Sequence, residues 1–280
     1  MPATTGRSYL AIPGPSVIPD RVLNAMHRAS PNIYEGEIIE MTGTILAGLR
    51  RLARTRHHAA IYIANGHGGW EAAITNMFSR GDKALSLSSG LFGTGWAGAA
   101  MRMGVDVEVR DFGRGPADPE RLAAALRADE NHAIRYVLAT HVDTASSVRN
   151  DIAAIRAAID AAGHPALLAV DAIASIGCDA LHMDEWGIDL IVGASQKGLM
   201  LPPGLALLWL SDKALARAQQ ADLATPYWSA VPRVAGAEYW HHFGGTPPPQ
   251  HLYGLHEALT MLLDEEGLEA AWSRHARLAA

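Results

Sequence analysis

The chain has 280 residues, of which 49% are hydrophobic, and a formal net charge of −6. A chain of this size can bury a substantial core in one large or two smaller domains. The mild acidic excess without a basic stripe argues against a nucleic-acid partner, and no apolar run reaches the roughly 18 residues of a membrane helix. One cysteine and no signal-peptide pattern lead us to expect a soluble cytoplasmic protein.

Short apolar runs alternate with helical patterns from about residue 59 onward. Strands are predicted over 59–64, 83–88, 105–109, 134–140, 166–171, 188–193 and 205–210. Helices are predicted after residue 65, near 93–103, over 118–128 with Asp118 as the N-cap, and over 151–162. Strands that are apolar throughout, with helices between them, indicate a mostly parallel central sheet covered on both faces, an α/β doubly wound architecture.

The C-terminal third has a different pattern. Residues 221–250 contain Pro, Trp and Gly without a clear period, and we interpret them as a long functional loop. The rest of the chain is predicted to be helical with a break near Gly267.

Ligands of doubly wound sheets bind beyond the carboxyl ends of the strands, so the residues directly after each strand are candidates for a site. "NGHGGW" (65–70) opens a helix and is either a phosphate cradle or an ordinary glycine-rich turn. Phe92 could stack on a flat cofactor or pack in the core. Asp143 and Thr144 either bind a ligand or serve as turn residues.

An acid and a lysine follow two further strands. Asp171 either holds a protonated ring nitrogen or is a capping or paired structural carboxylate. Lys197 lies between small and apolar residues, where desolvation would lower its pKa and make it a Schiff-base nucleophile; the alternative is a surface lysine in a loop. A phosphate cradle, a ring, an acid and a lysine at one sheet edge together fit pyridoxal phosphate.

Other chemistries lack their motifs. The histidine pairs at 57–58 and 241–242 are adjacent in sequence, and neither HExxH nor CxxC occurs, so no metal site is expected. No GxSxG elbow is present, and Cys178 has no motif for nucleophilic work.

Several longer segments carry a resemblance to a known family. "VDAIASIGCDALHMDEWGIDLIVGASQKGLMLPPGLALLWLS" resembles the class V aminotransferases of pyridoxal-phosphate fold type I, in particular the serine-, alanine- and aspartate-glyoxylate aminotransferases. The likeness extends from "IPGP" (12–15) through "NGHGGWEAAITNMFSRGDKAL" and "LATHVDTASS" to "GTPPPQHLYGLHEAL". It therefore covers nearly the whole chain and implies the fold of that family.

The resemblance also implies a role for each matching residue. Lys197 would form the imine with the cofactor and carry the proton, and Asp171 would pair with the pyridine nitrogen. The remaining cofactor contacts would come from Gly66 and His67 (phosphate, through backbone N–H), Gln196 (phosphate, through its side chain), Phe92 (ring stacking), Thr144 (ring hydroxyl side), Ile173 (opposite ring face) and Thr246 (phosphate of the neighbouring subunit in a homodimer).

Two departures from the family pattern bear on specificity and on domain organisation. Val142, Asp143 and Ser147 replace residues of the common T-H-N-E-T-x-T-G motif, which leaves the amino donor open. Relatives continue into a small C-terminal domain that carries the arginine for the substrate carboxylate, and no residue of 1–280 can be assigned that role. The expected organisation is an N-terminal segment (1–15), a large cofactor-binding domain (16–255) and the start of a linker helix (256–280) to a small domain that is largely absent.

The resemblance implies transamination of serine, alanine or aspartate with glyoxylate as the amino acceptor. Alternatives are a pyridoxamine-pyruvate-type or other class V enzyme, a non-catalytic protein of the same fold that lacks the carboxylate clamp, and a purely structural α/β dimerisation module. A cysteine desulfurase is disfavoured because Cys178 directly follows the Asp171 segment, whereas such enzymes need a mobile catalytic cysteine.

Overall fold

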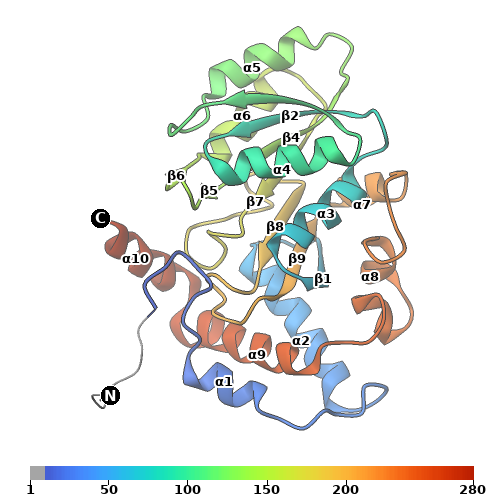
Figure 1. Cartoon of the computed structure of the whole chain (residues 1–280), viewed down its shortest axis with the longest axis vertical. Coiled ribbons are helices and arrows are strands. Elements are labelled where there is room, and N and C mark those ends of the chain that lie inside the picture. Colours follow the sequence, from blue (N-terminus) through green and yellow to red (C-terminus); the bar gives the residue numbers. More distant parts are fainter. Residues whose placement is uncertain (1–9) are drawn as a thin grey trace, which may run out of the picture.

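The computed structural model describes residues 10–280, so the first part of the expected N-terminal segment lies outside the described residues. Within that range one seven-stranded sheet has the order β1-β9-β8-β7-β4-β2-β3 (Figure 1). Its strands are β1 (His58–Ala64), β2 (Lys83–Ser88), β3 (Asp106–Asp111), β4 (Ile134–Thr140), β7 (Leu167–Asp171), β8 (Leu190–Ala194) and β9 (Gly204–Leu210). A short hairpin of β5 (Val142–Asp143) and β6 (Val148–Arg149) stands apart from it.

The main sheet is mostly parallel, as predicted. β2 pairs in parallel with β3 and β4, and the parallel series continues through β7 to β8. β9 runs antiparallel to both of its neighbours, β1 and β8. The carboxyl ends of β1, β4, β7 and β8 therefore share one edge of the sheet with the start of β9.

Helices cover both faces of this sheet (Figure 1). One face packs against α3 (Gly66–Met77), α4 (Leu91–Arg102) and α7 (Asp212–Ala218), and the other against α2 (Glu37–Leu52), α5 (Pro119–Ala128), α6 (Ile152–Ala161), α9 (Pro249–Leu259) and α10 (Leu268–Ala279). Successive strand residues alternate between the two cores: Ile61 belongs to one and Tyr62 to the other. Both cores are apolar, which explains why the strands read as continuous hydrophobic runs.

Side-chain caps start several of these helices. Asn65 caps α3, Asp118 caps α5, Asp151 caps α6 and Ser211 caps α7, in each case by accepting hydrogen bonds from backbone N–H groups of the first turn. The predicted cap at Asp118 is thus confirmed. Asn65 and Ser211 directly follow β1 and β9, so these two caps fix where the chain leaves the sheet.

The segment interpreted as a long loop contains two short helices, so that prediction was partly wrong. α8 (Val231–Ala235) and a 3-10 helix (Tyr239–Phe243) lie within it. Neither is long enough to show a period, and the buried Arg233 organises them by donating to the carbonyl oxygens of Ile61, Tyr227 and His242.

The N-terminal and C-terminal helices pack together at one end of the molecule. α1 (Asp20–Met26) and α2 both contact α9, and neither α1 nor α2 was assigned from the sequence. The break near Gly267 is confirmed: a π-helical segment (Thr260–Glu266) ends there, and Gly267 has a φ of 83° before α10 begins. No helix within residues 10–280 is long and apolar enough to span a membrane.

Candidate active site

Lys197 lies in a tight turn between β8 and β9. The Lys197 carbonyl accepts from the N–H of Met200, and Ser195 closes the turn by donating from Oγ to the carbonyl of Pro202. The ammonium Nζ donates to the carbonyl of Pro13 over 2.9 Å. Partial burial lowers the pKa of Lys197, while Asp171 acts in the opposite direction. A turn with small neighbours thus presents a partly desolvated amine at the sheet edge.

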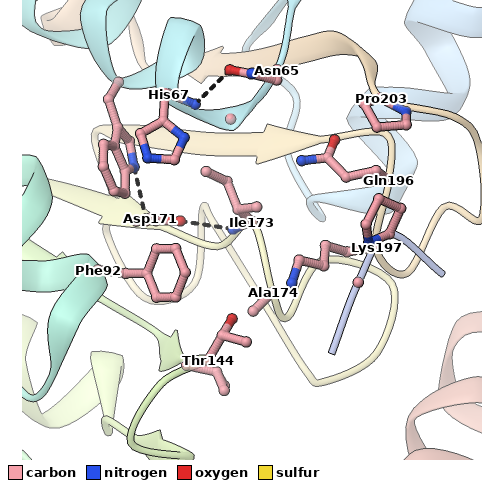
Figure 2. Close-up of a pocket in the computed structure, with 15 residues that line it drawn as sticks. Asn65, His67, Phe92, Thr144, Asp171, Ile173, Ala174, Gln196, Lys197 and Pro203 are labelled. Atoms are coloured by element: carbon pink, nitrogen blue, oxygen red, sulfur yellow. Dashed lines mark hydrogen bonds between the residues drawn. The ribbon is translucent and has the colours of Figure 1, made fainter. Parts of the chain in front are cut away.

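Asp171 is the last residue of β7 and is buried. Its Oδ1 accepts from the backbone N–H of Ile173 and its Oδ2 from the indole N–H of Trp70, both at 2.9 Å (Figure 2). Burial raises the pKa of Asp171 to about 6, and both hydrogen bonds act against that rise. The carboxylate is therefore held by two neutral N–H donors. A positively charged partner in this site would stabilise the ionised form of Asp171 and lower its pKa.

The N-terminus of α3 faces the same cavity. Asn65 Oδ1 accepts from the N–H groups of His67 (3.1 Å) and Gly68 (3.3 Å). A Cβ at Gly66 would lie 2.8 Å from Cδ1 of Ile173, so a side chain at position 66 would displace the Ile173 side chain that lines the cavity. Glycine permits close approach of a ligand to the backbone there, and the helix N-terminus provides the positive end of a helix dipole.

Phe92 and Thr144 are held near each other through Asp143. The Asp143 carboxylate accepts from the N–H groups of Phe92 (2.8 Å), Gly93 (3.1 Å) and Ala145 (2.9 Å). Asp143 itself is fully buried. Its role is therefore turn and helix capping, one of the two roles left open above, and it links the start of α4 to the loop that carries Thr144.

These residues surround one cavity of about 200 Å³ (Figure 2). The residues that line it come from the carboxyl edge of the sheet and from the N-terminal segment: Gly14, Pro15, Asn65, Gly66, His67, Trp70, Phe92, Val142, Thr144, Asp171, Ile173, Ala174, Gln196, Lys197 and Pro203. Lys197 and Asp171 share this cavity, as the assignment of an imine lysine and a ring-nitrogen acid requires.

Eight of the nine proposed site residues line the cavity, and Thr246 does not. Thr246 is exposed and borders a separate hollow with Ile33, Tyr34, Trp240 and Gly245. Of the three residues that replace the common family motif, Val142 lines the cavity, whereas Asp143 is a buried cap and Ser147 is exposed with a φ of 61°.

Four residues that contribute to the site were not among the predicted site residues: Asn65, Trp70, Pro13 and Gly14. Asn65 was part of the quoted motif and carries the N-cap signal of an Asn before a helix. Trp70 ends the same motif, but nothing local indicated that its N–H reaches Asp171. Pro13 accepts a hydrogen bond from Lys197 across 184 sequence positions, and its neighbour Gly14 lies against the same side chain. A contact at that separation has no sequence signal.

The cavity offers functional groups of the kind that bind an organic cofactor. Within residues 10–280 no group of three or more His, Cys, Asp or Glu side chains is arranged to hold a metal. The cavity instead offers one amine, one carboxylate, a ring and a helix N-terminus.

Comparison with known proteins agrees with this geometry. The aminotransferase class-V family model matches residues 8–280. A serine–glyoxylate aminotransferase of Methylorubrum extorquens is 42% identical over 98% of this chain, and an L-aspartate–glyoxylate aminotransferase of Paracoccus denitrificans is 39% identical over the same share. The chain covers 69% of the length of each. The crystal structure of pyridoxamine-pyruvate aminotransferase from Mesorhizobium loti superposes with a TM-score of 0.89 at 27% identity, over 100% of this chain and 71% of that one.

The fold and the site thus define an aminotransferase. The chain belongs to the class-V aminotransferase family, which confirms the resemblance and the α/β fold expected from the sequence.

Proposed function

We propose that this protein transfers the amino group of serine, alanine or aspartate to glyoxylate, with pyridoxal 5'-phosphate bound in the cavity at the carboxyl edge of the sheet. The observation that carries the proposal is that Lys197 and Asp171 line one cavity together with the N-terminus of α3. Relatives that are 38–42% identical have names that specify serine or aspartate as the donor and glyoxylate as the acceptor.

The residues present fit the cofactor. Gln196 lines the cavity, and its buried Oε1 has no hydrogen-bond partner in the described part of the chain, so nothing within residues 10–280 anchors the amide through this oxygen. The absence of a side chain lets the backbone of Gly66 lie directly against Ile173. A helix N-terminus for a phosphate, a carboxylate for a ring nitrogen and a lysine for an aldehyde make a complete donor set.

Pyridoxal phosphate, when bound, supplies a ring that accepts the electron pair left on the substrate α-carbon. Lys197 Nζ would hold the aldehyde and then, once displaced by the substrate amine, move the α-proton. Asp171 would keep the ring nitrogen protonated, Phe92 and Ile173 would pack on the two ring faces, and Gly66, His67 and Gln196 would bind the phosphate. Thr144 would contact the ring hydroxyl.

Three finer points also stay predictions. A homodimer would bring Thr246 of one subunit to the phosphate of the other; exposure of Thr246 beside Tyr34 and Trp240 supports this. The division into 1–15, 16–255 and 256–280 and a cytoplasmic location are likewise proposed. Contacts of Pro13 and Gly14 with Lys197 favour moving the first boundary toward the N-terminus.

A reduction experiment tests the cofactor site. The sequence has three lysines, Lys83, Lys197 and Lys213. After incubation with pyridoxal phosphate and borohydride, we expect peptide mass analysis to find the adduct on Lys197. Lys197→Ala should lose both the adduct and turnover, and Lys213→Ala, on the exposed side of α7, should keep both. An adduct mainly on Lys83 or Lys213, or wild-type turnover in Lys197→Ala, would contradict the proposal.

A substrate panel tests the reaction. Serine, alanine and aspartate are each offered with glyoxylate and with pyruvate, and pyridoxamine is offered with pyruvate. The structural likeness to a pyridoxamine-pyruvate aminotransferase favours that enzyme as the second candidate. Turnover of an amino acid with glyoxylate supports the main proposal. Turnover only in the assay that combines pyridoxamine with pyruvate supports the second candidate. A bound cofactor without any turnover indicates a non-catalytic protein.

A further inference from the structure

Trp70 is tied to the carboxylate of Asp171. It lies in the second turn of α3, is 4% exposed, and donates from Nε1 to Asp171 Oδ2 over 2.9 Å across 101 sequence positions. The other carboxylate oxygen, Oδ1, accepts from the backbone N–H of Ile173. Each oxygen of this acid thus has its own N–H donor, one from the strand end and one from the neighbouring helix.

We propose that Trp70 is a positioning residue for the reaction: its indole N–H fixes the orientation of the Asp171 carboxylate at the place where the acid is to meet a protonated ring nitrogen. This inference rests on the proposed function.

A second donor is needed because the carboxylate torsion of an aspartate is broad and roughly two-fold. A backbone N–H on one oxygen leaves the other oxygen free to swing. A donor on Oδ2 from a different element prevents that rotation, and an indole does so without adding charge to the cavity. Trp70 therefore orients Asp171 without competing with a cationic partner.

The position of the indole is itself determined by its neighbours. Its ring centroid lies 4.6 Å from that of His67 and 6.3 Å from that of Phe92, both of which line the cavity. Gly95 leaves space for the indole, since a Cβ there would lie 3.3 Å from the ring. Trp70 thus connects the α3 side of the cavity, the ring-stacking residue and the acid.

A second buried tryptophan, Trp96, shows that burial of an indole in this core does not by itself produce a hydrogen bond like that from Trp70 to Asp171. It is also buried and belongs to the same apolar core as Trp70. Over residues 10–280, however, its Nε1 has no hydrogen-bond partner. A tryptophan in this core can therefore be accommodated without a partner, and Trp96 provides a matched control in which only the ring matters.

The groups around Asp171 determine in which direction its pKa should change when the Trp70 N–H is removed. Burial raises the pKa of Asp171 and Asp143 adds to the rise, whereas the N–H groups of Ile173 and Trp70, and Lys197, lower it. Removing the Trp70 N–H should raise the pKa of Asp171 further, because one stabilising contact of the charged form is lost.

The first test uses the cofactor-free protein. Carbon-13 NMR of labelled aspartate follows the carboxyl group of Asp171 against pH in the wild type, Trp70→Phe and Trp96→Phe, with Asp171→Asn identifying the resonance. We expect the midpoint to rise by about one pH unit in Trp70→Phe and to stay at the wild-type value in Trp96→Phe. An unchanged midpoint in a folded Trp70→Phe protein would overturn the proposal.

A measurement on the wild type decides the case if Trp70→Phe does not fold. The indole ¹H–¹⁵N resonance of Trp70 should shift with the same midpoint as Asp171 and become independent of pH in Asp171→Asn. An indole resonance that ignores the titration of Asp171 would overturn the proposal.

Turnover gives the third reading. In the loaded enzyme Trp70→Phe should lower kcat about tenfold with little change in KM, the equivalent of about one pKa unit, and Trp96→Phe should change neither. Equal kcat values for Trp70→Phe and the wild type count against the positioning role. If the wild type shows no transamination at all, the proposed function fails, while both NMR titrations still decide whether Trp70 orients Asp171.

Discussion

The ammonium of Lys197 donates a hydrogen bond to the carbonyl of Pro13 over 2.9 Å, although 184 positions separate the two residues. The next residue, Gly14, has a φ of 146°, and a Cβ there would lie 2.7 Å from Cδ of Lys197 and 2.9 Å from Nζ. Ser16 adds a bond from its Oγ to the Lys197 carbonyl at 2.9 Å. The N-terminal segment therefore forms part of the wall beside the amine.

Gly14→Ala should impair the site directly, because the added methyl collides with Lys197 and the backbone at φ 146° disfavours any side chain. We expect the borohydride-trapped cofactor adduct on Lys197 to fall at least about tenfold, as for an overpacked site costing 1–3 kcal/mol. Gly43→Ala is the matched control, since nothing lies within 4 Å of a Cβ there. If both variants trap the cofactor like the wild type, the N-terminal segment does not restrict Lys197.

Asp171→Asn should keep the fold and the cofactor but lower kcat about 100-fold, because a neutral amide does not stabilise a protonated ring nitrogen. Asp189→Asn is the comparison. Asp189 is also buried and directly precedes β8, but its carboxylate accepts hydrogen bonds from Leu168 N–H and Ser211 Oγ and does not line the cavity. That variant should lower the unfolding free energy and leave kcat unchanged. Equal half-reaction rates in Asp171→Asn and the wild type would rule out the ring-nitrogen role.

His141 should make the protein sensitive to mild acid. Burial lowers the pKa of this residue to about 4, and Nδ1 lies 2.9 Å from Oγ of Ser175. Below pH 6.5 the unfolded chain binds the proton and the folded protein does not, so stability is lost as the pH falls from 6.5 toward 4. The loss from this group between pH 7 and pH 5 should be about 2 kcal/mol.

Asp171 acts with the opposite sign over part of that range. Its pKa is raised to about 6, so the folded protein binds a proton before the unfolded chain does, and stability rises as the pH falls from 6 toward 4. The two effects partly cancel in the wild type. Urea unfolding of His141→Asn should therefore show a protein that gains stability relative to the wild type between pH 7 and pH 5, whereas the exposed-site variant His27→Asn should follow the wild type.

Arg233 should be a large contributor to stability. It is 1% exposed, its guanidinium donates to three carbonyl oxygens, and it lies 4.1 Å over the ring of Tyr62. Arg233→Ala leaves these buried carbonyls unpaired, and we expect the unfolding free energy to fall by about 3 kcal/mol or more. Arg233→Lys should give a smaller loss, and Arg56→Ala, at an 86% exposed side chain, a change within about 0.5 kcal/mol. Urea titration compares the three, and similar losses at positions 233 and 56 would contradict this role.

Local patterns were sufficient for the strands and for the residues directly after them. Apolar runs of five to seven residues are visible in the chain itself. Asp171 ends one such run and Lys197 follows another by three residues, so local sequence indicates both as candidates. The family resemblance then gave them roles. The short helices in the segment 221–250 were not predicted, because they are stabilised by tertiary contacts such as those of Arg233 and are too short to show a helical period.

The amino-acid sequence alone determined which side chains carry chemistry and that they follow strands of an apolar sheet, because strand burial and turn chemistry are properties of neighbouring residues. Only the tertiary structure decided that Pro13 and Gly14 lie against Lys197 and that Trp70 bonds to Asp171. Those contacts depend on the strand order β1-β9-β8-β7-β4-β2-β3 and on helix packing across it, which bring together residues that no local pattern relates.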